Sequence, residues 1–200
     1  PDRKPAVEAT RSLLREKGIP HASFYELVDF APELPEEQRA LLEAQLLDAG
    51  ILDALVVPPE AHDALCELLQ NHPDQFLCLE DVCEETVSLP LCAEPGAPAW
   101  ADPETLLKRI GCRPGSATWF AVDGSYRQGI LKGHSVPDSP ARYIGASARK
   151  ANRARQIQQL ENLIQEKSGE IHQAQQQLTQ CKETLARLNQ EYTQRPTTAN

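Results

Sequence analysis

The sequence predicts an α+β fold in which a globular domain is inserted at the tip of an antiparallel coiled coil. Two observations lead to this prediction. Apolar residues recur in alternating steps of three and four from residue 157 to residue 192, which is the pattern of a coiled-coil seam. Short apolar runs separated by Gly and Pro fill residues 18–147, and Asp123-Gly124 stands between two of them as a hairpin turn.

The first third of the chain predicts helices that alternate with short strands. Helical spacing of apolar residues ends at Gly18, a residue that commonly terminates helices. Pro35 followed by two acids predicts a helix start, because Pro fits the first turn and acids favour the positive end of the helix dipole. The predicted elements are helices over 5–17, 36–50 and 59–69 and strands over 24–30 and 51–57.

The middle of the chain predicts a shorter helix and a hairpin. Asp102 before Pro103 is a capping acid followed by Pro, which marks a helix start. Asp123-Gly124 is typical of the tight turn that joins two antiparallel strands. The predicted elements are strands over 76–79 and 87–91, a helix over 103–110 and hairpin strands over 117–122 and 126–131.

The C-terminal quarter predicts one long helix that is the outgoing arm of the coiled coil. Lys167 is the one strongly polar residue in its seam, and Gly169 faces away from it. The seam consists of Ile157, Leu160, Ile164, Lys167, Ile171, Ala174, Leu178, Cys181, Leu185, Leu188 and Tyr192. The predicted division is 1–17 as the end of an incoming arm, 18–147 as the globular domain, 148–193 as the outgoing arm and 194–200 as a disordered tail.

A helix with one apolar stripe needs a partner. The arm 148–193 is about 65–70 Å long and the helix over 1–17 only about 25 Å, so the incoming helix covers only part of the seam. Either two copies pair their free ends, or the missing helix precedes Pro1 in a longer protein. The sequence contains no Met, not even an initiator, which favours the second interpretation.

Charge is segregated along the 200 residues, whose formal net charge is -9. Residues 31–110 carry 17 acids and three bases, whereas residues 111–200 carry seven acids and twelve bases. A basic face therefore remains compatible with the acidic total. No apolar run reaches 18 residues and no secretory leader is present, so we expect a cytoplasmic protein with no membrane partner and with reduced cysteines.

The motifs of common catalytic sites are missing from the sequence. It has no phosphate-binding P-loop, nucleophile elbow, metalloprotease helix or calcium loop, so we expect no enzymatic activity in this segment. Cys78 and Cys83 are close to each other in the sequence, but no second pair follows at a zinc-site spacing, so no metal site is predicted. The acids at 80–85 are interpreted as solvated surface.

A basic stretch at the start of the long helix is the one candidate binding site. Two of its residues, Arg149 and Arg153, are four apart and share a helix face. Such a stripe either neutralises DNA phosphates or is a solvated helix start whose positive charges balance those of the acidic region. The candidate DNA-binding residues are Arg142, Arg149, Lys150, Arg153 and Arg155.

Three blocks of the sequence together resemble a known family: residues 24–30 (FYELVDF), 49–54 (AGILDA) and 143–149 (YIGASAR) followed by heptads. The chain is similar over nearly its whole length to the middle of the SMC-like ATPase subunit (JetC, MksB-like or EptC) of bacterial Wadjet plasmid-defence systems. The resemblance implies an SMC-hinge-like domain that homodimerises, with ATP and magnesium bound at heads outside this segment. Kleisin-type and nuclease subunits would contact other parts of the protein.

The resemblance to general SMC hinges is carried by the second half of the globular region. Gly124, Gly129 and Gly133 correspond to glycines near the hinge dimer contact, and His134 departs from the pattern where a second glycine is usual. Two alternatives to a hinge stay open. One is a coiled-coil adaptor that binds a protein through an acidic globular head, and the other is a nucleic-acid-binding module that uses the basic stretch.

Overall fold

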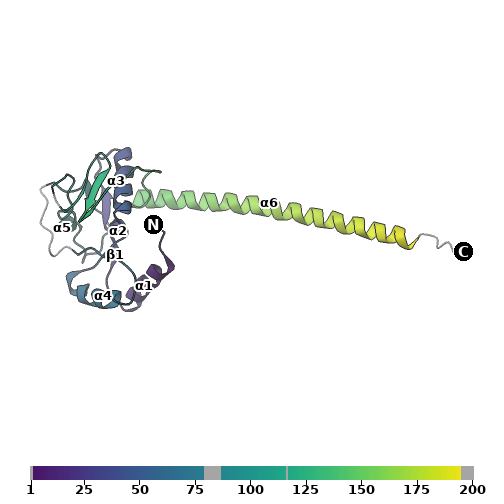
Figure 1. Cartoon of the computed structure of the whole chain (residues 1–200), viewed down its shortest axis with the longest axis horizontal. Helices are drawn as coiled ribbons and strands as arrows, with labels where there is room; N and C mark the ends of the chain where they lie inside the picture. The colour runs from purple at the N-terminus through teal and green to yellow at the C-terminus, as the bar shows by residue number, and fades with distance from the viewer. Residues whose placement is uncertain (1, 79–86, 116, 195–200) are drawn as a thin grey trace. The chain divides into compact units, whose positions relative to one another are not determined.

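The computed structural model describes residues 2–78, 87–115 and 117–194 (Figure 1). The chain divides into two compact units, Pro1–Asn152 and Arg153–Asn200. The predicted mixed α+β class is confirmed, since helices and small antiparallel sheets form unit 1 and one long helix ends the chain. In order, the elements are α1 Pro5–Glu16, β1 Ala22–Ser23, α2 Phe24–Leu27, β2 Val28–Phe30, α3 Glu36–Asp48, β3 Leu55–Val56, η1 Pro59–Ala61, α4 His62–Leu69, β4 Leu91–Ala93, α5 Pro103–Leu107, β5 Thr118–Phe120, β6 Ser125–Gln128, β7 Leu131–His134 and α6 Ala146–Thr193.

The strands of the described residues form three small sheets, all antiparallel. β1 pairs with β3, and β2 pairs with β4, so both of these sheets join segments far apart in the sequence. The third sheet has the order β5-β6-β7, and it contains the predicted hairpin around Asp123-Gly124. Strand β7 was not predicted, because its sequence around Gly133 does not alternate apolar and polar residues.

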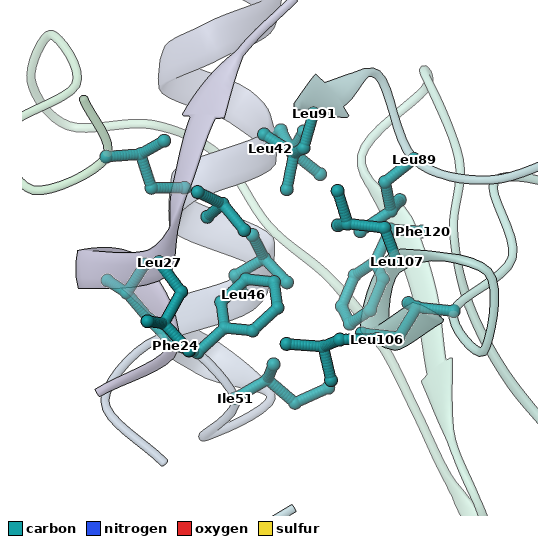
Figure 2. Close-up of a cluster of buried hydrophobic side chains, with 14 of the residues drawn as sticks. Phe24, Leu27, Leu42, Leu46, Ile51, Leu89, Leu91, Leu106, Leu107 and Phe120 are labelled. Carbon is teal, nitrogen blue, oxygen red and sulfur yellow. The ribbon is translucent and has the colours of Figure 1, made fainter. Parts of the chain in front are cut away.

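A leucine-rich core holds unit 1 together. Figure 2 shows leucines of α3 and α5 converging on Phe24 and Phe120. Each fully buried side chain of this size contributes about 1.5–3 kcal/mol. A second cluster, Leu14, Leu55, Leu65 and Leu68, packs α1 against α4 and β3, near the lower edge of the unit in Figure 1. The helix over 5–17 therefore buries one face inside unit 1, and its assignment to an incoming arm stays a prediction.

Two predicted strands in the first third of the chain are largely wrong. Residues 24–27 form the short helix α2, and only Val28–Phe30 extend as a strand. Ser23 and Glu26 cause the difference, because they form a capping box in which the Glu26 carboxylate accepts the Ser23 N–H at 2.9 Å. The strand predicted over 51–57 shrinks to β3, because residues 51–54 form a turn.

Three predictions in the middle of the chain are shifted or shortened. The strand predicted over 87–91 appears as β4 at Leu91–Ala93, where it has β2 to pair with. The strand predicted over 76–79 is reduced in the described residues to one bridge at Phe76, and Leu79 lies outside them. The helix predicted over 103–110 begins as expected, with the Asp102 carboxylate accepting the Thr105 N–H at 3.1 Å, but it ends at Leu107.

The long helix α6 has 48 residues, a length of about 72 Å. Its predicted seam lies wholly in unit 2, where Ile157, Leu178 and Leu188 are each about half exposed. Its first turns, up to Asn152, belong to unit 1. No helix within the described ranges is long and apolar enough to cross a membrane.

Candidate functional site

The segment that leads into α6 is fixed by a buried carboxylate. Glu43 of α3 accepts the backbone N–H groups of Arg142, Tyr143 and Ile144 at 2.6, 2.9 and 2.9 Å. Glu43 is 6% exposed and Ile144 is fully buried. Buried N–H groups are costly when unpaired, so this one side chain satisfies the backbone just before the helix begins. We call residues 142–152 the helix root.

Arg149 ties the first turns of α6 to the globular core. Its guanidinium donates to the backbone carbonyls of Tyr25 at 3.1 Å and Tyr143 at 3.2 Å. It also forms an ion pair of 3.3 Å with Glu94, whose side chain is 10% exposed. Hydrogen bonds that involve a charged group contribute about 1.5–3 kcal/mol each, and both backbone acceptors of Arg149 belong to unit 1. Arg149 is therefore chiefly an anchor of the helix root.

The helix root brings together the three sequence blocks that carry the family resemblance. The Tyr25 and Tyr143 rings lie 6.1 Å apart, and the Tyr25 N–H donates to the Leu52 carbonyl at 3.1 Å. Gly145 has a φ of +83°, and a Cβ at this position would collide with the Asp29 carboxylate. Glycine is required there on both grounds. Residues 24–30, 49–54 and 143–149 thus form one continuous structure.

A buried charged network connects α1 to the same region. We call it the Arg11 network, and its members are Arg3, Arg11, Ser23, Asp53 and Asp74. Arg11 is 3% exposed and uses its whole guanidinium, donating to both Asp74 oxygens at 2.8 and 3.1 Å, to Ser23 Oγ at 2.7 Å, and to Asp53 Oδ1 and its carbonyl at 3.0 and 2.7 Å. Arg3 adds two hydrogen bonds of 2.8 Å to the Asp53 carboxylate.

The network keeps its charges by pairing them. Burial alone would raise the pKa of the Asp53 carboxyl, but hydrogen bonds from Arg3 and the charge of Arg11 outweigh it and lower that pKa. The hydrogen bond with Asp53 raises the pKa of Arg3. Burial raises the pKa of Tyr25, which lies beside the network. Both Asp53 and Arg3 therefore stay ionised near neutral pH.

The five predicted DNA-binding residues have unequal surroundings. Arg149 is engaged as described, and Arg142 donates to Ser139 and forms an ion pair with Asp138. Lys150, Arg153 and Arg155 are exposed. The spacing in the sequence groups all five, but two of the three acceptors of Arg149 come from residues 25 and 94, which no local pattern identifies.

The three glycines predicted at a dimer contact have roles within the chain. A Cβ at Gly124, where φ is +92°, would approach the Ser135 carbonyl to 2.7 Å, and a Cβ at Gly133 would collide with the Tyr126 ring. Gly129 lies in the β6–β7 turn with open space around it and a φ of +56°. The dimer contact itself stays a prediction.

The β6–β7 hairpin carries exposed apolar side chains next to an open strand edge. Ile130 is 99% exposed and Leu131 63%, and Val136, two residues after β7 ends, is 76% exposed. β7 is the last strand of its sheet, and no other strand of the described residues pairs with its outer edge. The outer edge of β5, in contrast, meets Gly111 in a bridge at Trp119. An open, apolar edge favours pairing with another chain.

Three important residues were missed by the sequence analysis. Arg11 lies between Val7 and Leu14 on the apolar face of α1, and a charge at such a position predicts a buried partner. Glu43 and Asp53 gave no comparable signal, because their partners lie far away in the sequence. Across the described ranges, no three His, Cys, Asp or Glu side chains are grouped to hold a metal ion.

The chain matches no protein-family model, and no curated protein is significantly similar to it in sequence.

Proposed function

We propose that this chain is the homodimerisation hinge of an SMC-like DNA-handling ATPase that restricts closed circular plasmid DNA. The observation that carries the proposal is the meeting of the three resemblance blocks at the helix root. Arg149 contacts Tyr25, Gly145 lies against Asp29, and Tyr25 contacts Leu52. A shared role in the helix root would explain why blocks so far apart in the sequence all resemble the same family.

Strand β7 is the proposed contact between two copies. Gln128 and Leu131 flank the two-residue turn and pair with each other, and at the other end of the ladder the Ser135 N–H donates to the Gly124 carbonyl at 2.9 Å. Pairs alternate along an antiparallel ladder, so the N–H of Lys132 faces away from β6 and is free to bond a second strand. The exposed side chains of Ile130 and Leu131 lie beside this edge and would lose water contact on association.

The proposal is tested by sedimentation of the full chain at tens of micromolar. The wild-type chain should sediment at twice its mass of 22.1 kDa. Lys132→Pro should give a monomer, because proline removes the outward N–H and leaves the pairing with β6 intact. Lys132→Ala is the matched control, since it removes the charge but keeps the N–H, and it should stay dimeric.

One result would contradict the proposed hinge, and another would contradict the proposed role of β7. A wild-type monomer at this concentration would favour the alternative, an adaptor whose acidic globular head binds a different protein. A dimer that persists in Lys132→Pro would place self-association elsewhere in the chain.

The remaining parts of the proposal concern the whole machine. This segment carries out no chemistry in it, and ATP and magnesium bind at heads outside these residues. Kleisin-type and nuclease subunits contact other regions, and the protein works in the cytoplasm. DNA contact at this end of the arm is proposed to use Lys150, Arg153 and Arg155, which are exposed, rather than Arg149.

A further inference from the structure

We propose that Tyr25 couples the two helices of unit 1 that begin and end the globular fold, so that loosening α1 also loosens the root of α6. One residue contacts both sides: its hydroxyl accepts a hydrogen bond from Arg3, and its backbone carbonyl accepts one from Arg149. The coupling goes beyond the proposed function and rests only on contacts within one chain. It holds whether or not the protein dimerises.

On the α1 side, Arg3 precedes the helix and is held by several acceptors. It donates to the Tyr25 hydroxyl at 3.3 Å, to Ser23 Oγ at 3.2 Å and to both Asp53 oxygens at 2.8 Å. Its side chain is 21% exposed. A guanidinium with this many partners is fixed in position, so it holds the Tyr25 ring as well as the Asp53 loop.

On the α6 side, Tyr25 is held by the helix root. Arg149 donates to the Tyr25 carbonyl at 3.1 Å, and the Tyr143 ring packs against the Tyr25 ring at a tilt of 59°. Arg149 reaches Glu94 in the same position. If Tyr25 moves, Arg149 loses one of its two backbone acceptors and Tyr143 loses its aromatic neighbour.

The short helix α2 makes Tyr25 a rigid connection. The capping box of Ser23 and Glu26 fixes the start of α2, and the Phe24 N–H donates to the Ala54 carbonyl at 3.0 Å. Phe24 is fully buried in the main core. Residues that share partners in one network influence one another's stability, whereas distant residues behave independently. Because α2 is only four residues long, it cannot absorb a displacement of Tyr25 by bending.

Hydrogen exchange of the full chain tests the coupling. Arg3→Ala should speed exchange of the amides at 149–152 by at least about fivefold, measured relative to the amide of Leu46 in the α3 core. Fivefold is the lower end of the usual coupling between linked sites. Arg149→Ala should speed exchange of the α1 amides by a similar factor, because coupling between two sites is reciprocal. Lys4→Ala is the matched control, since Lys4 is exposed beside Arg3, and it should leave both regions within about twofold of wild type.

Tyr25→Phe identifies the route. It removes the hydroxyl that Arg3 contacts but keeps the backbone carbonyl and the ring that face the helix root. In this background, Arg3→Ala should change exchange at 149–152 much less than it does in the wild type. An equal effect in both backgrounds would overturn the proposal, and so would a rise at 149–152 no larger than that at Leu46.

Discussion

Replacing Arg11 by methionine should destabilise unit 1 strongly. The side chains of Arg11 and Asp74 are 4% and 2% exposed, so neither charge is screened by water. Without Arg11, the described residues offer Asp74 only the Gln75 backbone N–H at 2.8 Å, while Asp53 keeps Arg3. Breaking a buried pair from one side costs about 3–5 kcal/mol, because the remaining charge is left uncompensated. Nearly all of that cost arises at Asp74.

Urea unfolding followed by tryptophan fluorescence measures this loss. Trp119 is 5% exposed, and both tryptophans lie in unit 1, so the signal reports the unit that contains the network. With an m-value of about 2 kcal/mol per molar urea, the midpoint should fall by about 1.5–2.5 M. Adding Asp74→Asn to Arg11→Met should recover part of the loss, because it removes the unpaired charge.

Arg15→Met is the matched control on the same helix. The Arg15 side chain is 57% exposed and its ion pair with Glu8 is 3.3 Å long, so its loss should cost less than about 1 kcal/mol. If Arg11→Met costs no more than Arg15→Met, Asp74 does not hold an uncompensated buried charge in the variant. A further loss of stability on adding Asp74→Asn to Arg11→Met would contradict the same cause.

Three further predictions concern pH, DNA and the arm. The lowered pKa of Asp53 should stabilise the fold fully above the unfolded-state pKa of about 3.9, and this stability should be lost as pH falls through the lower folded-state pKa. Below neutral pH, the free energy of unfolding of Asp53→Asn should therefore change less with pH than that of the wild type. In a fluorescence anisotropy titration, the wild type should bind duplex DNA weakly near 50 mM salt and release it by about 200 mM. Arg153→Glu combined with Arg155→Glu should abolish this binding. Unchanged binding would mean that the basic stretch is a solvated surface. A parallel, in-register pair of α6 helices would place the two copies of Lys167 against each other in the seam, so we expect no such pair. Without it, the two copies of Cys181 do not face each other. Mild oxidation should therefore give no dimer linked through Cys181, and Cys181→Ser should give the same species as the wild type.

Local patterns were sufficient for the helices with clear ends. α3 begins one residue after Pro35 and ends before Gly50, and α5 begins at the cap provided by Asp102, as predicted. The hairpin around Asp123-Gly124 is equally local, because a turn and its two flanking strands are adjacent in the sequence. In each case, the residues that decide the structure lie within a few positions of one another.

Non-local partners decided the rest. Strand β4 formed at 91–93 rather than at 87–91 because β2, some 60 residues earlier, pairs with it there. Arg149 shares a helix face and a charge with Arg153, yet only Arg149 is reached by the Tyr25 carbonyl and Glu94. The sequence by itself determined the α+β class, the main helices, the hairpin and the apolar stripe of α6. The tertiary structure alone decided which charged residues are buried anchors and which remain on the surface, because a charge is buried only where distant segments supply its partners.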